Sequence, residues 1–440
     1  MEPTDFQKEK LEWLENNKDR CILTDMSTFM FLSQYDIQDI SPCCSIDNTK
    51  INLKLEDLTS ERPFAKLEQQ FTKNKMPEAC HKCEMQESIG AISERGRSVL
   101  YGLEDKTQFD NYVKNRNTGT YSIHIKFSNF CNLACRICSA SESTTYGKTT
   151  KTTKVELDDI SENPYYWNIF LNFIEKKLAE FETIDLIMVG GETMLAPGFY
   201  KVIDWLCDNS YASRVQLKIT TNLTVNPSKK LLEQFSQFKQ TGICASLDST
   251  YENFHYVRWP AKWSKIEENL ATLIDYQDTY DNLSFYLTIN WNLNNIFYIN
   301  DFIEYWHNCK MYNYIYVMHL YFPSQLQVEQ LPKTYVAPLV KLLTECLEHP
   351  MFKSYPRTYE SLYDFIKTTI EYFKDPQDDP KYFDHYLKYS AGFDTRTDTS
   401  LAVYNKRLYD LLTDEDKNKY QEHYQYYKTH GTEEQLVHIR

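Results

Sequence analysis

The chain has 440 residues, with 62 acidic against 48 basic side chains and a formal net charge of −14 at pH 7. Hydrophobic residues make up 42% of it, and it holds only 11 glycines but 34 tyrosines and 24 phenylalanines. This composition excludes a disordered, collagen-like or low-complexity chain and predicts one large or several ordinary globular domains. The acidic balance argues against nucleic acid as a partner, because it gives no broad attraction to phosphate backbones.

The N-terminal segment predicts a protein that stays in the cytoplasm. Residues 1–20 are charged and amphipathic and lack the apolar stretch of about 7 to 15 residues that marks a signal peptide. No later segment has the roughly 18 uncharged residues of a membrane span, so we expect no membrane partner. We therefore place the chain in the cytoplasm. Clustered cysteines in such a reducing compartment indicate metal or redox chemistry rather than disulfides.

Hydrophobic periodicity predicts the architecture. Before residue 100 no regular rhythm is present, which indicates a small, loop-rich unit. From residue 120 onward, period-two segments alternate with segments of helical spacing. The predicted strands are 121–127, 185–189, 214–220, 242–247, 283–290 and 312–321, and the predicted helices lie near 167–181, 199–206, 231–238, 263–273 and 296–306. This alternation predicts an α/β fold with a parallel sheet, open or curled toward a barrel.

Beyond residue 330 the chain turns helical and polar, with aromatic side chains at helical spacing. Such stripes are typical of helix-helix packing, so we assign this extension no chemistry. Four isolated cysteines among apolar neighbours are expected to be small buried hydrophobic residues: Cys207, Cys244, Cys309 and Cys346.

Three cysteines follow the first predicted strand with the spacing C-x3-C-x2-C: Cys131, Cys135 and Cys138. Three thiolates do not complete a structural zinc site, which normally has four protein ligands. A 4Fe-4S cluster on three thiolates would keep one iron open for an exogenous ligand, and ligands of α/β sheets bind at the edge where this loop lies. From the spacing alone, a zinc site completed by a distant Cys or His remains an alternative.

This motif resembles the signature of the radical S-adenosylmethionine (SAM) superfamily. The resemblance implies a 4Fe-4S cluster on Cys131, Cys135 and Cys138, with SAM bound to the fourth iron through its amino and carboxylate groups. It further implies an external reductant, such as flavodoxin or ferredoxin, and cleavage of SAM to a 5′-deoxyadenosyl radical. Ile137 departs from the family pattern, in which an aromatic residue precedes the third cysteine.

A second motif, Gly190-Gly191-Glu192, directly follows the second predicted strand. Glycines let the backbone approach a ligand closely, and a carboxylate suits a cationic amino group. By itself the motif is a common turn, but at this strand end it resembles the GGE motif that holds the SAM amino group.

Later strand ends carry further polar residues that resemble family positions. In relatives, a polar side chain lies near SAM, an S-x-D segment holds the ribose, and an arginine pairs with the SAM carboxylate. The matching residues are Asn222, Ser246, Asp248 and Arg258. For each of them alone, turn capping or a surface ion pair is an equal alternative.

A second set of cysteines precedes residue 100: Cys21, Cys43, Cys44, Cys80 and Cys83. The last two form a C-x2-C knuckle, and two earlier thiols can complete a four-thiolate site for zinc or a closed iron-sulfur cluster. The arrangement resembles the SPASM/twitch auxiliary-cluster module of radical SAM maturases, placed before the barrel as in phage and bacterial twitch-domain proteins. The resemblance implies a second 4Fe-4S cluster, with zinc as the alternative. It leaves open the choice between Cys43 and Cys44 and the membership of Cys21.

These resemblances predict three domains: a twitch-like domain over 1–110, a partial (β/α)6 TIM-like barrel over 111–325 and a helical extension over 326–440. The expected function is radical SAM modification of a peptide or protein, as SPASM/twitch relatives often perform. Two alternatives remain. One is radical modification of a small metabolite or nucleotide, and the other is a non-catalytic interaction protein whose zinc or iron-sulfur sites only stabilise the fold.

Overall fold

The computed structural model describes residues 4–31, 39–51, 53–72, 75–89, 91–103, 105–152, 159–309, 314–375 and 380–430. The chain divides into two compact units. The first unit consists of residues 1–128, 157–219 and 229–241, and the second of residues 129–156, 220–228 and 242–440. The cysteine-rich N-terminal region therefore shares a unit with the first strands of the sheet.

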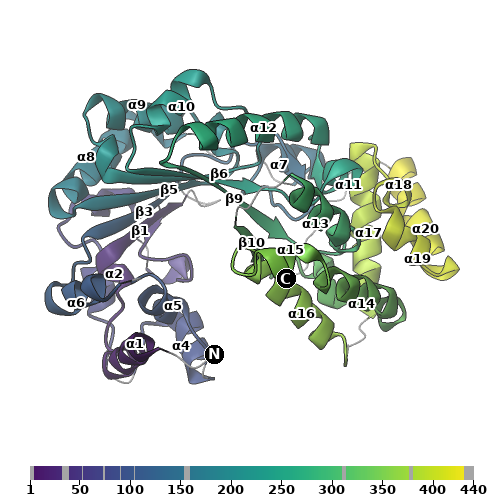
Figure 1. Ribbon diagram of the computed structural model, residues 1–440, viewed down its shortest axis with the longest axis horizontal. Coiled ribbons are helices and arrows are strands. Elements are labelled where there is room, and N and C mark those ends of the chain that lie inside the picture. Colours follow the sequence, from purple (N-terminus) through teal and green to yellow (C-terminus); the bar gives the residue numbers. More distant parts are fainter. Residues whose placement is uncertain are drawn as a thin grey trace. The chain divides into compact units, whose positions relative to one another are not determined.

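The first unit is built on a mostly parallel sheet (Figure 1). Its strands, in spatial order, are β2 (Asp39–Ser41), β1 (Ser27–Phe31), β3 (Thr120–Lys126), β5 (Thr183–Val189) and β6 (Val215–Thr221). Ile123 of β3 lies beside Leu186 of β5, which lies beside Leu217 of β6. All three side chains are fully buried, while their strand neighbours alternate with less buried positions. One face of the sheet thus carries the core of this unit.

Helices flank this sheet. They are α1 (Asp5–Asn16), α2 (Leu23–Met26), α3 (Ala65–Glu68), α4 (His81–Ser88), α5 (Glu94–Leu100), α6 (Lys106–Asn115), α8 (Pro164–Glu180), α9 (Pro197–Asp208) and α10 (Lys229–Phe235). α8 begins where the Asn163 side chain accepts a hydrogen bond from the Tyr165 amide and Pro164 takes the first helical position. α8, α9 and α10 cover one face of β3, β5 and β6 (Figure 1). The predicted strands and helices of residues 121–238 are confirmed.

The N-terminal region is more regular than the predicted loop-rich unit. β1 pairs in parallel with β3, and the hydroxyl groups of Thr28 and Tyr121 lie 2.6 Å apart. β2 then pairs with β1 in the antiparallel direction. A five-residue strand directly after the short helix α2 carries too few alternating positions to stand out from its surroundings, which is why periodicity missed it.

The second unit contains a parallel set of strands and a separate two-stranded ribbon. The strands are β4 (Ala134–Cys135), β7 (Gln240–Ser246), β8 (Arg258–Trp259), β9 (Leu283–Asn290) and β10 (Ile315–Met318). β7, β9 and β10 are neighbours in that order, and β4 pairs with β8. β10 is shorter than predicted because its partner β9 ends at Asn290, opposite Met318. Residues 312–313 of that prediction lie outside the described residues.

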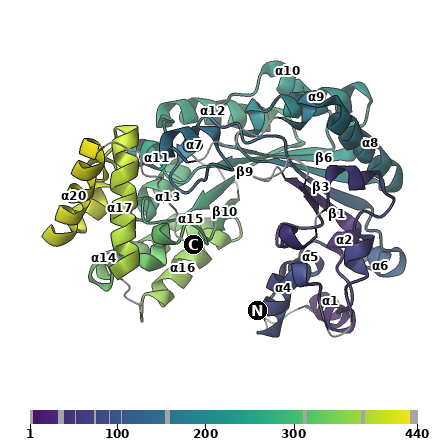
Figure 2. The ribbon, with the colours of Figure 1, turned by 180° about the vertical axis from the view of Figure 1, so that it is seen from behind.

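The C-terminal extension is helical, as predicted. The helices of the second unit are α7 (Thr144–Thr150), α11 (Tyr251–Val257), α12 (Trp263–Thr279), α13 (Ile299–Asn308), α14 (Lys333–Leu347), α15 (Pro350–Ser354), α16 (Glu360–Tyr372), α17 (Pro380–Thr397), α18 (Leu401–Tyr404), α19 (Lys406–Leu411) and α20 (Asp414–His430). α17 and α20 pack side by side (Figure 2). Among the described helices, none is long and apolar enough to cross a bilayer.

The isolated cysteines only partly follow the prediction. Cys244 and Cys346 are buried, whereas Cys207 is half-buried and Cys309 is exposed. Cys309 lies just beyond the last residue of α13, whose buried face ends at Trp306. The prediction of a buried residue was wrong there because Cys309 follows the end of the helix and no longer faces the core.

Candidate functional site

The C-x3-C-x2-C loop is fixed by pairing with the segment that carries Arg258. Cys135 in β4 lies opposite Arg258 in β8, and the Arg136 amide donates a 3.0 Å hydrogen bond to the Val257 carbonyl. The Cys138 amide then donates to the Cys135 carbonyl at 2.9 Å, which closes a tight turn. The loop is therefore part of a hydrogen-bonded ribbon with the segment around Arg258.

The start of α7 holds the other end of the loop. The Ser143 hydroxyl donates to the Leu133 carbonyl at 2.5 Å and also accepts a hydrogen bond from the Tyr146 amide, so this side chain caps α7. The Thr145 hydroxyl donates to the Cys131 carbonyl at 2.6 Å. The start of α7, which follows the cysteines in the chain, thus holds the backbone of Cys131 in place.

The three thiols form one electrostatically coupled group. All twelve cysteines of the chain lie in its described part and are free thiols. Burial raises the pKa of Cys135 to about 12, and the nearby charge of Cys131 adds to the rise while the Arg258 guanidinium opposes it. Burial, with Cys135 and Cys131 as neighbours, raises the pKa of Cys138 well above its usual value. Such thiols are protonated until a metal replaces the proton.

The three thiols of the loop could hold either a zinc ion or a 4Fe-4S cluster. Sulfur atoms on one tetrahedral zinc ion lie about 3.8 Å apart. Within the described ranges, no three His, Cys, Asp or Glu side chains are close enough together to bind a single metal ion. A 4Fe-4S cluster instead takes each thiolate on a different iron and spreads them more widely. Three free, electrostatically coupled thiols on one loop are the donor set that a 4Fe-4S cluster with one open iron would take.

Polar residues predicted at later strand ends lie around this loop. The Asn222 amide nitrogen is 3.0 Å from Asn132 Oδ1 and 3.8 Å from Cys131 Sγ. Arg258 Nη1 is 3.8 Å from Cys135 Sγ. Both predicted residues therefore contact the cysteine loop itself. Asn132 was not predicted, and its only sequence signal is a polar side chain directly after the first cysteine.

Asp248 and Arg258 form a buried ion pair, with Arg258 Nη2 2.6 Å from Asp248 Oδ2. The other carboxylate oxygen of Asp248 accepts a 2.8 Å hydrogen bond from the Asn290 amide. Ser246 Oγ lies 3.3 Å from Thr288 Oγ1. The predicted SAM-binding side chains thus have protein partners here, and a ligand that used Asp248 or Arg258 would have to exchange with one of them.

Gly190-Gly191-Glu192 lies in the first unit, directly after β5. Gly190 has φ +90° and Gly191 φ +37°, and a Cβ on Gly190 would come within 2.2 Å of Lys126 Cγ. The glycines therefore permit a left-handed turn against the Lys126 stem. Glu192 is 1% exposed, and its carboxylate accepts a 3.2 Å hydrogen bond from the Met194 amide. The motif is a tight turn with an inward carboxylate.

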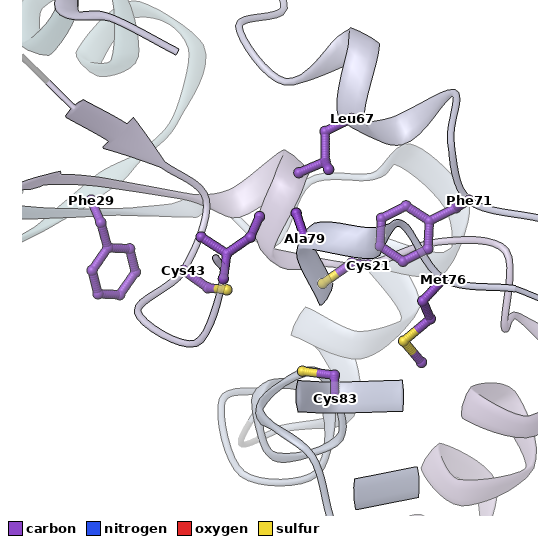
Figure 3. Close-up of a cluster of buried hydrophobic side chains, with 9 residues drawn as sticks. Cys21, Phe29, Cys43, Leu67, Phe71, Met76, Ala79 and Cys83 are labelled. Carbon is purple, nitrogen blue, oxygen red and sulfur yellow. The ribbon is translucent and has the colours of Figure 1, made fainter. Parts of the chain in front are cut away.

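The N-terminal cysteines form a second group, which we call the N-terminal thiol cluster: Cys21, Cys43, Cys80 and Cys83. Cys21, Cys43 and Cys83 belong to one buried cluster of side chains, and the less buried Cys80 packs against it. Figure 3 shows the sulfur atoms of Cys21, Cys43 and Cys83 turned toward a common region. Segments from α2, β2 and α4 are thereby brought together.

Electrostatic coupling links all members of the N-terminal thiol cluster. Burial raises the pKa of Cys21 to about 12, and the charges of Cys80 and Cys83 add to this. Burial likewise raises the pKa of Cys43, with contributions from Cys21 and Cys83, and that of Cys80 to about 12, with contributions from Cys43 and Cys83. The side chain of Cys44 is exposed, and after burial the charge of Glu94 is what most raises its pKa. Cys44 therefore stands at the edge of the cluster.

Comparisons with known proteins identify the class of the central region. Residues 125–295 match the profile of the radical SAM superfamily. This segment is therefore similar to radical SAM domains, a class of domain that implies an enzyme. A 4Fe-4S cluster and SAM are typical of that superfamily. The mixed α/β fold with its parallel sheet and helical C-terminal region is of the predicted partial-barrel class. No curated protein matches the chain by sequence.

Several solved structures are similar at low identity. anSMEcpe with bound AdoMet is 17% identical, with a TM-score of 0.38, over 51% of this chain and 60% of that one. Streptococcus suis SuiB bound to its precursor peptide SuiA is 11% identical, with a TM-score of 0.36, over 63% and 61% of the two chains. TYW1 with a lysine-pyruvate adduct is 16% identical, with a TM-score of 0.31, over 61% and 90%. The chain thus spans about 60% of the first two structures.

Proposed function

We propose that this radical SAM enzyme holds a 4Fe-4S cluster on Cys131, Cys135 and Cys138 and uses it to cleave SAM reductively. The observation that carries the proposal is the set of three coupled, unbridged thiols on a hydrogen-bonded loop, with a guanidinium 3.8 Å from the middle sulfur. When bound, the cluster supplies one electron to SAM, which then yields methionine and a 5′-deoxyadenosyl radical.

The surrounding side chains have distinct roles in this proposal. Arg258, beside Cys135, pairs with the SAM carboxylate, for which its planar fork is well suited. Asp248, now paired with Arg258, orients that fork and would exchange its contact with the Asn290 amide for one with the ribose, which Ser246 also contacts. Asn222, in contact with the loop through Asn132, adds a polar contact to SAM. Glu192 with Gly190 and Gly191 receives the amino group.

We assign the N-terminal thiol cluster to a second, auxiliary 4Fe-4S cluster with four protein ligands. The support is that four thiols from separate segments converge and are mutually coupled. Zinc on the same four thiols is the alternative. Four protein ligands leave no open iron, so this site serves electron transfer or structure rather than SAM binding.

The substrate class we propose is a peptide or protein side chain. It rests on the resemblance of the N-terminal cysteine pattern to SPASM/twitch maturases. anSMEcpe and SuiB have both been solved with peptides bound. A small metabolite or a nucleotide is the alternative outcome, and comparing the proteome and metabolome of cells with active enzyme and with the Cys135→Ala variant separates the two.

Anaerobic reconstitution tests the chemistry. Protein loaded with iron and sulfide is expected to form 5′-deoxyadenosine from SAM when dithionite is added, and Cys135→Ala is expected to abolish this product. The matched control is Cys309→Ala, which changes an exposed thiol in the same unit. A colourless, zinc-loaded protein, or a Cys135→Ala variant as active as wild type, would contradict the proposal.

A further inference from the structure

Arg136, between the second and third cysteines of the loop, is a fully buried cation. Its guanidinium stacks 3.5 Å from the ring centre of Tyr256 and 4.5 Å from that of Phe393, and its side chain is 0% exposed. Arg136 Nε donates to the Tyr256 carbonyl at 2.8 Å. An arginine cannot lose its charge in a protein, so this position needs a buried anion.

Asp394 of α17 is that anion. It lies 2.5 Å from Arg136 Nη2 and is also 0% exposed. The carboxylate accepts further hydrogen bonds at 2.7 to 2.8 Å from the Thr399 hydroxyl, the Leu401 amide and the Tyr420 hydroxyl. Thr399, which follows α17, and residues of α18 and α20 therefore fix both oxygens of Asp394. A rigid, fully hydrogen-bonded carboxylate is the kind that can hold a buried cation in one position.

A second contact from α17 reaches the backbone of the same loop. The Tyr389 hydroxyl donates to the Arg136 carbonyl at 2.7 Å and lies 3.2 Å from the Tyr146 hydroxyl of α7. The charge of Cys138 contributes to the raised pKa of Tyr389, after burial, so this ring lies near the third cysteine. α17 thus holds both the side chain and the carbonyl of Arg136.

The same helices hold the segment that supports Asp248. Asn405 donates to the Leu293 carbonyl at 3.0 Å, and the Tyr386 hydroxyl lies 3.3 Å from Asn294 Oδ1. Asn295 of that segment donates to the Asp248 carbonyl at 2.6 Å. The C-terminal extension therefore contacts the cysteine loop and the segment that supports Asp248.

We infer that the C-terminal extension is a positioning element of the active site, and that Asp394 acts through Arg136 to hold the cysteine loop and to neutralise the charge beside its cluster. The inference rests on the proposed cluster at the three cysteines. Reduction makes a cluster one charge more negative, and its potential depends on nearby charge and hydrogen bonds. Loss of the Asp394 charge leaves the Arg136 cation uncompensated, which favours the reduced cluster.

The test compares Asp394→Asn with Asp394→Glu. In reconstituted protein, Asp394→Asn is expected to shift the one-electron reduction equilibrium of the loop cluster toward the reduced form by about tenfold, measured by redox titration with electron paramagnetic resonance. Asp394→Glu restores the charge and is expected to return the equilibrium most of the way to wild type. The control is Asp410→Asn, which removes an exposed carboxylate paired with Lys406 in the same extension.

A second measurement does not need the cluster. In metal-free protein, alkylation of Cys135 and Cys138 by iodoacetamide, followed by mass spectrometry, is expected to be at least several-fold faster in Asp394→Asn and in Tyr389→Phe than in wild type. Tyr389→Phe keeps every charge and should leave the reduction equilibrium within about twofold of wild type. If Asp394→Asn does not fold, alkylation of Tyr389→Phe decides the positioning role.

The outcomes separate the two proposals. Wild-type protein that takes up no iron at the three cysteines overturns the proposed function, while the alkylation rates still test the role of the extension. If the wild-type protein binds the cluster, and folded Asp394→Asn matches wild type in both measurements, the inference is overturned. The proposed function then still stands. If Asp394→Asn shifts the reduction equilibrium and Asp394→Glu shifts it equally, the effect comes from packing. That outcome overturns the proposed role of the Asp394 charge.

Discussion

At the scale of single residues, chain neighbours can have opposite environments. Cys43 is 8% exposed and takes part in the N-terminal thiol cluster, whereas the adjacent Cys44 is exposed. The Ser41 hydroxyl donates to the Cys43 carbonyl at 3.1 Å, which fixes the turn after β2 and directs the two side chains differently. This turn geometry is what makes Cys43, and not the adjacent Cys44, a candidate ligand.

This difference predicts unequal effects of two equivalent substitutions. Cys43→Ser removes one of four coupled thiols, so reconstituted protein should lose the iron of the N-terminal site, about half of the total if both sites carry 4Fe-4S clusters. Cys44→Ser is the matched control and should keep its iron. Iron and sulfide analysis of both variants checks this, and equal loss in the two, or loss in Cys44→Ser alone, would exclude Cys43 as the ligand.

The sequence indicated most candidate site residues but not their contacts. The cysteine spacing selects the loop, and polar residues at strand ends select Asn222, Asp248 and Arg258. The pairing of Asp248 with Arg258 could not be predicted, because two opposite charges in separate segments can equally face a ligand or each other. Arg136 was missed because its partner Asp394 is 258 positions away. A charged residue inside an otherwise apolar and cysteine-rich loop is the signal that would have revealed it.

At the scale of elements, periodicity succeeded where a strand or helix buries one long face. β3, β5 and β9 alternate buried and less buried positions over seven or eight residues, and this pattern is visible in the sequence. Periodicity missed β1 because its five residues give too little alternation. It missed β4 and β8 because two residues give no alternation at all. These short strands form only when distant segments meet, so local sequence does not specify them.

The contact between β1 and β3 predicts a pH-dependent stability. The His124 ring stacks on Phe29 with centroids 3.8 Å apart, and burial, with the charge of Lys218, lowers the pKa of His124 to about 4. In the unfolded chain His124 binds a proton near pH 6.5, whereas in the folded chain it binds one only near pH 4. The free energy of unfolding therefore falls as the pH drops from about 6.5 to about 4. The loss should reach about 3 kcal/mol at most.

Urea unfolding at pH 7.5 and pH 5 checks this prediction. His124→Gln should make the free energy of unfolding of the chain less dependent on pH between these values. His430→Gln, at the exposed end of α20, should keep the wild-type dependence. A His124→Gln variant with an unchanged pH dependence would show that His124 is not a buried neutral ring.

At the scale of the whole molecule, the N-terminal region is continuous with the sheet of the first unit. β1 lies between β2 and β3, so residues 1–128 share a hydrogen-bonded ladder with β5 and β6. The predicted separation of a domain over residues 1–110 remains a prediction, but removal of that segment would take two strands, β1 and β2, from the sheet. Exposed strand edges promote aggregation.

Two truncations of metal-free protein test this continuity. A chain that starts at residue 43 lacks β1 and β2 and should aggregate, because the edge of β3 becomes free. A chain that starts at residue 19 lacks only α1 and should stay soluble with a lowered melting temperature, since Trp13 and its ring contacts with Phe109 and Tyr112 are lost. Size-exclusion chromatography separates the outcomes, and a monomeric chain starting at residue 43 would contradict the argument.

The buried pair of Arg136 and Asp394 also imposes an order on biosynthesis. The ribosome releases the cysteine loop long before α17, so in the nascent chain the Arg136 guanidinium has water rather than a carboxylate as its partner. The loop can adopt its final conformation only after α17 has been synthesised. If the loop holds the proposed cluster, iron and sulfide can reach a fully formed site only after that point, and a product terminated before α17 would carry the three cysteines on a loop without its anchor.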